Sequence, residues 1–226
     1  MLNKRKKRNY IFPIKHIPSK RIFDILFSLF SIFLLSPVFI LISLLIFFTS
    51  KGTIIYKSLR LGRGGKIIGC YKFRTMYKDA DKKLQNILIK DSELNKEWQL
   101  FQKLKKDPRI TPIGSFLRKS SLDELPQFFN VLKGDMSIVG PRAFVLIGPK
   151  ENFHLEIQLY LKDKTQKILS IRPGITGLWQ ISGRSEISIQ ERILIDESYI
   201  DKRNFFFDVY LILKTIPIIF FSKGAY

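Results

Sequence analysis

Asp123 and Glu124 are adjacent carboxylates within residues 120–127, "SSLDELPQ". A carboxylate is ionised at neutral pH, so an aspartate can attack phosphorus without a separate base and form an aspartyl-phosphate type intermediate. One or two carboxylates together with substrate phosphates also make an ordinary Mg²⁺ site. The pair is therefore a candidate for phosphoryl transfer. On a helix, where neighbours are about 100° apart, the two side chains are expected to face different directions and to have different roles.

Basic residues on both sides of this pair are candidates for binding phosphates. Guanidinium forks match phosphate oxygens, and a helix N-terminus attracts phosphate. The candidates are expected in loops or at loop–helix junctions rather than on obvious solvent-facing surfaces. They are Arg109, Arg118, Lys119, Arg142, Arg172 and Arg184.

The acidic pair also fits a structural role. Ser121 and Glu124 have the spacing of a capping box, and Asp123 would then sit in the first turn, where the helix dipole favours an acid. In that register Pro126 would be the fifth helical residue, where its missing N–H matters. A helix that starts near Leu125 would instead place Pro126 at its first position. The sequence leaves both registers open.

Composition narrows the classes of function. The chain of 226 residues has 39 Lys and Arg against 19 Asp and Glu, a formal net charge of +20. So basic a protein is expected to meet nucleic acid, an anionic membrane surface or phosphorylated substrates. The single cysteine, Cys70, excludes an internal disulfide framework and is expected to be a small apolar residue in a reducing compartment. His16 and His154 lack metal-ligand spacing, which argues against zinc catalysis.

An apolar stretch over residues 22–49 predicts contact with a membrane. As a helix it would be about 42 Å long, which exceeds a hydrocarbon core of about 30 Å. Pro37 breaks the stretch, and the Ser36 hydroxyl can satisfy a freed carbonyl. Both flanks are rich in Lys and Arg, which places both in the cytoplasm. We therefore expect a helix–break–helix hairpin that enters one leaflet and returns. A tilted, kinked spanning helix is the alternative.

The remaining segments predict an α+β, mostly helical fold with a small β element. Residues 51–76 predict short strands around a basic glycine loop at 60–66, which either approaches a phosphate or forms a solvated hairpin turn. Residues 77–104 predict an amphipathic helix or helical pair, and residues 187–203 predict a helix. Residues 205–221 are marginal for spanning, so they predict either an interfacial helix or a buried core helix. Turn-rich loops are expected at 107–119, 133–142 and 170–186.

An ordered series of long motifs resembles the bacterial sugar transferase family, the monotopic phosphoglycosyl transferases that start glycan assembly on undecaprenyl phosphate. The resemblance covers nearly all of residues 20–226. One position departs from the family pattern, because Ala143 stands where the family usually has proline after Arg142, which raises the question of what keeps that loop rigid. The matching stretches are "KRIFDILFS", the central Ser36-Pro37, "YKFRTM", "DPRITPIGSFLRKSSLDELPQFFNVLKGDMSIVGPR", "RPGITGLWQISGR" and "DVYLILKTI".

The resemblance implies a division of the chain and a location. Residues 1–19 would be a basic arm, and residues 20–50 a re-entrant membrane helix broken at Ser36-Pro37. Residues 51–226 would form a catalytic domain on the cytoplasmic face of the bacterial inner membrane, held there by amphipathic helices and by an interfacial helix at 205–221.

The resemblance also implies a mechanism. Asp123 would attack the β-phosphate of a UDP-sugar, UMP would leave, and undecaprenyl phosphate would take the sugar phosphate. Mg²⁺ would be bound at Asp123 with Glu124 as its partner. The residues that would bind the substrate phosphates and nucleotide are Lys72, Arg74, Arg109, Arg118, Arg142, Arg172, Gly174 and Arg184.

Partners follow from the same resemblance. The segment before "DPRIT" and the closing "KGAY" resemble galactose-1-phosphate and glucose-1-phosphate transferases, so UDP-galactose or UDP-glucose is the expected donor. Anionic inner-membrane lipids are expected partners and nucleic acid is not, while the oligomeric state stays open, a homodimer included. From composition alone, a non-enzymatic membrane-anchored scaffold or a nucleic-acid-binding protein remains the alternative.

Overall fold

The computed structural model describes residues 18–101, 104, 106–144, 164–183 and 188–220. Over these residues the chain is mostly helical and carries two small two-stranded sheets, which confirms the predicted α+β class. The predicted basic arm lies outside the described residues except at its last two positions, and Arg184 lies outside them entirely.

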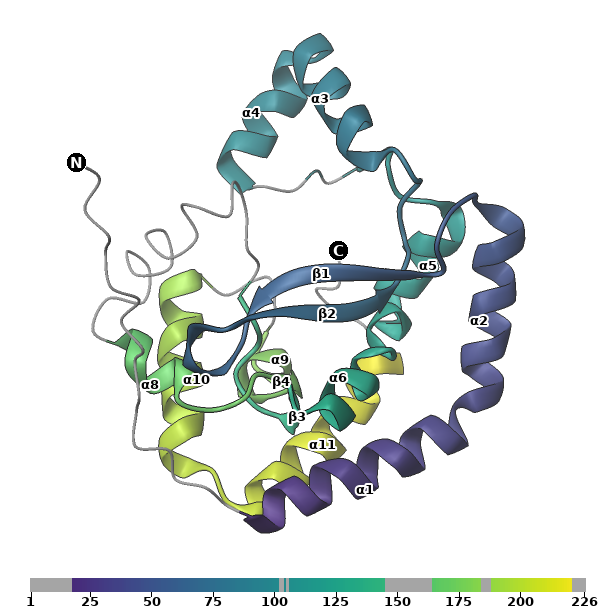
Figure 1. Ribbon diagram of the computed structural model, residues 1–226. Helices are drawn as coiled ribbons and strands as arrows, with labels where there is room; N and C mark the ends of the chain where they lie inside the picture. Colours follow the sequence, from purple (N-terminus) through teal and green to yellow (C-terminus); the bar gives the residue numbers. More distant parts are fainter. Residues whose placement is uncertain (1–17, 102–103, 105, 145–163, 184–187, 221–226) are drawn as a thin grey trace, which may run out of the picture.

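Two apolar helices run along one side of the molecule (Figure 1). α1 spans Pro18–Leu34 and α2 spans Ser36–Thr49, with a bend of 61° between them. Pro37 cannot donate to the carbonyl of Phe33, and the Ser36 hydroxyl donates to that carbonyl at 2.8 Å. The predicted break is therefore confirmed. No helix among the described residues is long and apolar enough to cross a bilayer alone; this bent pair meets the length and composition criteria only when its two helices are taken together.

An antiparallel hairpin follows the two apolar helices. β1 (Ile55–Leu61) pairs with β2 (Ile67–Phe73), and the short 3₁₀ helix η1 (Arg63–Gly65) forms the turn. Gly64 and Gly65 have φ values of 67° and 75°, which glycine adopts without a steric penalty. The basic glycine loop is thus the hairpin turn that was one of its two predicted forms.

The outer edge of β2 is occupied by a side chain of α6 (Gln127–Lys133). The Asn130 amide donates to the Gly69 carbonyl at 2.7 Å, and its oxygen accepts from the Tyr71 N–H at 2.8 Å. These are the two groups that a neighbouring strand would pair. Asn130 therefore fixes α6, and the segment that precedes it, against the hairpin.

A second, parallel sheet lies in the core. β3 (Ser137–Val139) and β4 (Gly174–Thr176) form it, and every residue of β3 is buried. The segments 133–142 and 170–186 were expected to be loops only, so this strand pair corrects the prediction. A three-residue strand buried on both faces has no alternation of polar and apolar residues by which a sequence could reveal it.

The other helices complete the fold. α3 and α4 confirm the predicted helical pair and project from the rest of the molecule (Figure 1). α5 begins after Thr111, whose side chain accepts from the Gly114 N–H at 2.9 Å. The bounds are α3 Ala80–Lys90, α4 Ser92–Phe101, α5 Pro112–Lys119, η2 Leu122–Glu124, α8 Thr165–Leu169, α9 Leu178–Ile181, α10 Ile189–Lys202 and α11 Phe205–Phe220.

α11 has one buried face, as predicted for a core helix, and one exposed apolar face, while its contact with a membrane stays a prediction. Its inner face is buried, with Leu211 0% exposed, whereas Phe206 on its outer face is 81% exposed. Asp208 on the inner face accepts from Lys20 of α1 at 2.6 Å and from the Tyr199 hydroxyl of α10 at 2.7 Å. These polar contacts join α1, α10 and α11 on their inner faces. The outer faces of α1, α2 and α11 carry exposed apolar side chains. Exposed apolar residues of α1, α2 and α11 include Ile22, Leu26, Phe30, Phe33, Ile40, Leu44, Phe47, Phe48, Leu213 and Ile216.

Candidate active site

The acidic pair lies in a tight turn between two helices. Ser121 has a left-handed backbone with φ 57° and makes no capping hydrogen bond, and Leu122–Glu124 forms the 3₁₀ helix η2. The capping-box prediction is therefore wrong, because the left-handed backbone at Ser121 starts a 3₁₀ turn instead of an α-helix. α6 begins only at Gln127, directly after Pro126, which is close to the later of the two predicted registers.

Lys72 of β2 joins the two carboxylates. Its Nζ lies 3.3 Å from Asp123 Oδ2 and 2.7 Å from Glu124 Oε1. The expectation that the two acids face different directions is therefore corrected in part: the tight turn lets both reach one ammonium group. Their remaining contacts differ, since Glu124 also binds Arg142.

The two carboxyl groups have opposite pKa shifts. Burial raises the pKa of Asp123, Lys72 opposes this rise, and the charge of Glu124 adds to it. Burial also disfavours the charged form of Glu124, but Arg142 and Lys72 outweigh that cost and hold its pKa well below the usual range. Glu124 is therefore the firmly ionised member of the pair. Asp123 is the more basic of the two.

Hydrogen bonds to main-chain carbonyls hold the loop that carries Arg142. Three successive carbonyls of this loop each accept a hydrogen bond from another element, so the loop is fixed without the proline that the family usually has after the arginine. The bonds run from Arg192 Nη2 to the Arg142 oxygen at 2.5 Å, from Arg60 Nη1 to the Ala143 oxygen at 3.1 Å, and from the Leu61 N–H to the Phe144 oxygen at 3.0 Å.

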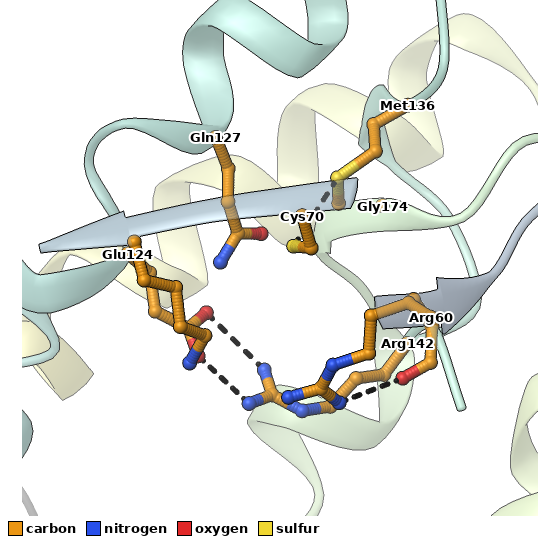
Figure 2. Close-up of a pocket in the computed structure, with 9 residues that line it drawn as sticks. Arg60, Cys70, Glu124, Gln127, Met136, Arg142 and Gly174 are labelled. Carbon is orange, nitrogen blue, oxygen red and sulfur yellow. Dashed lines mark hydrogen bonds and ion pairs between the residues drawn. The ribbon is translucent and has the colours of Figure 1, made fainter. Parts of the chain in front are cut away.

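A narrow pocket opens beside Glu124 (Figure 2). Cys70 on its wall is a buried free thiol, as the sequence predicted. Gly174 also lines it, but a Cβ at this position would collide with the backbone nitrogen of Gly140, so close contact of β3 and β4 already requires glycine here. The lining residues are Arg60, Cys70, Lys72, Glu124, Gln127, Met136, Arg142, Ala143 and Gly174.

Of the predicted phosphate-binding residues, Lys72, Arg142 and Gly174 line this pocket. Arg118 lies close by: its Nε donates to Thr75 Oγ1 at 2.9 Å, and its charge acts on Asp123.

Other predicted residues have contacts elsewhere. Arg109 forms an ion pair with Asp107 at 2.6 Å, and Arg74 donates to the carbonyl and hydroxyl oxygens of Ser50 at the end of α2. Arg172 donates to the Gly134 carbonyl at 2.7 Å, beyond the end of α6. Lys119 is exposed. The structure does not bring these four to the pocket walls.

Sequence reasoning missed three residues of the site. Arg60 belongs to the basic glycine loop, for which phosphate approach was one of two predicted roles but no residue was named, and Gln127 directly follows the "DELP" motif. Both residues could have been identified from the sequence, because each lies in or next to a stretch that had already been singled out. Arg192 lies on the distant helix α10 and contacts the Arg142 loop only through tertiary packing, so no local signal marks it.

The carboxylates fit a metal that is shared with substrate phosphates. Within the described part of the chain, no group of three or more His, Cys, Asp or Glu could hold an ion by itself. Asp123 Oδ1 has no hydrogen-bond partner among the described residues, whereas both oxygens of Glu124 accept from Arg142. One or two carboxylates are what Mg²⁺ takes from proteins when phosphates and waters supply its other ligands.

Comparisons with known proteins agree with the motif pattern. The profile of the family described as bacterial sugar transferase matches residues 15–222. The exopolysaccharide production protein ExoY of Sinorhizobium fredii is 42% identical over 209 residues, which cover 92% of this chain and 88% of ExoY.

Two longer relatives match over a part of their length. The undecaprenyl-phosphate galactose phosphotransferase of Salmonella typhimurium is 40% identical over 207 residues. The UDP-glucose:undecaprenyl-phosphate glucose-1-phosphate transferase of Klebsiella pneumoniae is 38% identical over 213 residues. Each match covers 92% of this chain and 41% of the relative.

Proposed function

Because this chain belongs to the bacterial sugar transferase family, we propose that it moves a sugar phosphate from a UDP-sugar to undecaprenyl phosphate and releases UMP. Relatives named for a galactose and for a glucose transfer to undecaprenyl phosphate support UDP-galactose or UDP-glucose as the donor. The observation that carries the proposal is the pair of Asp123 and Glu124, held by Lys72 and Arg142 at the edge of a cationic pocket. The reaction would begin the assembly of a polysaccharide or glycoconjugate.

The proposed reaction has two steps. An oxygen of Asp123 forms a bond to the β-phosphorus of the UDP-sugar, while the bond from that phosphorus to the bridging oxygen breaks and UMP leaves with its electron pair. A phosphate oxygen of undecaprenyl phosphate then attacks the same phosphorus and restores the Asp123 carboxylate. The raised pKa of Asp123 supports its role as nucleophile, and the firmly ionised Glu124 would hold Lys72 and Arg142 toward the phosphates.

Mg²⁺ fits this proposal as a cofactor. When bound, the ion would neutralise negative charge on the phosphates that are being separated. Asp123 would hold it through the oxygen that Lys72 does not contact, and Glu124 is the second candidate ligand.

We also propose that α1 and α2 enter one leaflet of the inner membrane and return, with the catalytic residues on the cytoplasmic face. The 61° bend, the exposed apolar side chains of both helices and the basic flanks support this topology. Basic residues near the surface would then attract anionic lipids. Tags placed at residues 1 and 226 should be accessible from the same side of the membrane, and protection on opposite sides would refute the hairpin.

The deciding experiment is a UMP-release assay. The full chain is mixed with undecaprenyl phosphate, Mg²⁺ and each member of a panel of UDP-sugars. We expect release with at least one sugar, and we expect the Asp123→Asn variant to release UMP only at background level. Absence of turnover with every UDP-sugar, together with salt-sensitive nucleic-acid binding, would favour the non-enzymatic alternative.

A further inference from the structure

Arg60 is a half-buried cation that forms no ion pair with a carboxylate of the described residues. Its side chain extends from β1 into the pocket (Figure 2), where Nε donates to Ser58 Oγ at 3.2 Å and Nη1 to the Ala143 carbonyl at 3.1 Å. None of the ion pairs found among the described residues includes Arg60, although Lys72 and Arg142 on the same pocket wall both contact Glu124. Burial and the neighbouring Arg142 both lower the pKa of Arg60. Taking such a charge partly out of water is costly unless an anion reaches it.

Gln127 presents a second unpaired polar group to the same pocket. Its side chain is 3% exposed, and its amide points into the space between Glu124 and Arg60 (Figure 2). No hydrogen bond to this amide is formed by any described residue. A buried amide ordinarily has a partner, and its NH₂ group can donate to an oxyanion. The pocket therefore offers an oxyanion the Gln127 amide and Arg60 Nη2, neither of which donates a hydrogen bond to a described residue.

We propose that Arg60 and Gln127 bind the phosphate that Asp123 does not attack, which is the α-phosphate that leaves as UMP. This inference rests on the proposed function. Lys72 contacts both carboxylates and so faces the phosphorus under attack, whereas Arg60 contacts neither carboxylate. As the bridging oxygen departs, negative charge grows on the leaving phosphate, and a fixed guanidinium stabilises that charge.

The competing explanation is that Arg60 only holds the Arg142 loop through the Ala143 carbonyl. That role would reach the phosphate only through Arg142, which the loop carries, so it predicts no loss of UMP affinity from a change at Gln127. UMP and uridine differ only in the phosphate, so their affinities in variants of both Arg60 and Gln127 separate the two explanations.

The experiment measures the affinities of UMP and uridine by calorimetry on the full chain in detergent. Arg60→Met should weaken UMP binding by about 10- to 100-fold, because a hydrogen-bonded charge contact is lost, while uridine affinity stays unchanged. Arg60→Lys should fall between Arg60→Met and the wild type. Gln127→Glu should also weaken UMP binding, because it brings a negative charge to the phosphate.

Lys57→Met is the matched control. It removes one positive charge from an exposed position on the same strand, and it should leave UMP affinity within about twofold of the wild type, as screening of an exposed charge predicts. Unchanged UMP affinity in Arg60→Met, or equal losses for UMP and uridine, would overturn the inference. If Arg60→Met loses its cooperative unfolding transition, Gln127→Glu decides by the same two affinities.

Failure of the proposed function has a different signature. A wild-type protein that binds UMP in an Arg60-dependent way but releases no UMP from any UDP-sugar would retain the anion site and refute the transfer reaction. A protein that turns over UDP-sugars while its UMP affinity does not depend on Arg60 would retain the reaction and overturn the anion site.

Discussion

Glu124 and Arg142 form a two-point ion pair, with Nη2 2.8 Å from Oε1 and Nη1 3.3 Å from Oε2. This parallel geometry keeps Glu124 ionised and leaves it little freedom to act on its own. Asp123, one residue earlier, has Lys72 as its only direct partner among the described residues and keeps one oxygen uncommitted. The two neighbouring acids therefore differ in their contacts. Glu124 is tied to the cations, whereas Asp123 keeps an oxygen that is free to contact a substrate or an ion.

Asp123→Asn is expected to reduce UMP release to background, because an amide does not attack phosphorus. Glu124→Gln should slow the reaction by about 10²-fold, the usual effect of removing one preorganised electrostatic group, and should still form some covalent intermediate. Trapping of a labelled sugar phosphate on the protein without acceptor measures the difference. Asp79→Asn, at an exposed position, is the control and should behave as wild type. Substantial turnover in Asp123→Asn would exclude Asp123 as the nucleophile.

Chelation of divalent cations should stop the reaction. With EDTA in excess we expect UMP release to fall to background, and added Mg²⁺ should restore it, because Asp123 and Glu124 would hold the ion together with the substrate phosphates. A rate that is the same with and without EDTA would show that Lys72, Arg142 and Arg118 suffice to neutralise the phosphates.

The stability of the protein should carry a pH dependence from Asp196. Burial raises the pKa of this carboxyl to about 7, although Arg192 lies 3.6 Å away and opposes the shift. An unfolded aspartate has a pKa of about 3.9, so the unfolded state releases this proton first, and the contribution of Asp196 to the free energy of unfolding falls as the pH rises from about 4 to about 7.

Asp196→Asn should abolish that dependence. The Tm of the variant relative to wild type should therefore increase between about pH 5 and about pH 7.5, as measured by thermal unfolding. Asp201→Asn, at an exposed position on the same helix, should show no such trend. A difference that stays constant over this range would contradict the raised pKa of Asp196.

Lys20 and Asp208 should prove important for joining the N-terminal and C-terminal apolar helices. Loss of one partner from a buried ion pair costs about 3–5 kcal/mol, and because the Lys20 side chain is 19% exposed we expect about 2–3 kcal/mol for Lys20→Met. This corresponds to a fall in Tm of about 4–12 °C. The double variant with Asp208→Asn should lose less than the sum of the two single losses.

Lys66→Met is the control for this cycle. Lys66 is 75% exposed and lies 3.9 Å from Asp135, so its loss should cost less than about 1 kcal/mol. Additive losses at Lys20 and Asp208 would show that the two residues do not stabilise each other.

The predictions from sequence that succeeded rest on local rules. Pro37 has no N–H wherever it stands, so the break after Leu35 and the Ser36 hydrogen bond could be foreseen. Glycines at 64 and 65 predict a turn because glycine adopts positive φ values without a steric penalty. The contact of the acidic pair with basic residues could be anticipated because its motif and its basic surroundings are both visible in the sequence, while its role in catalysis stays a prediction.

The predictions that failed depended on distant contacts. Serine is a common helix-capping residue, yet Ser121 adopts a left-handed backbone in the turn that brings η2 into contact with β2. The contact from Arg192 to the Arg142 loop spans 50 positions in the sequence, and Arg60 reaches Ala143 across 83. Only the folded chain places these guanidinium groups together, so their roles become visible only with the structure.

The Asn130 side chain has a further consequence for the surface of the molecule. A two-stranded hairpin leaves two edges where another chain could add a strand, and such edges promote aggregation. By pairing with Gly69 and Tyr71, Asn130 blocks the β2 edge with an amide that cannot be extended into a further strand. The hairpin is thereby protected from growth on that side, and intermolecular strand addition there would first have to pull α6, and with it the turn that carries Asp123, out of place.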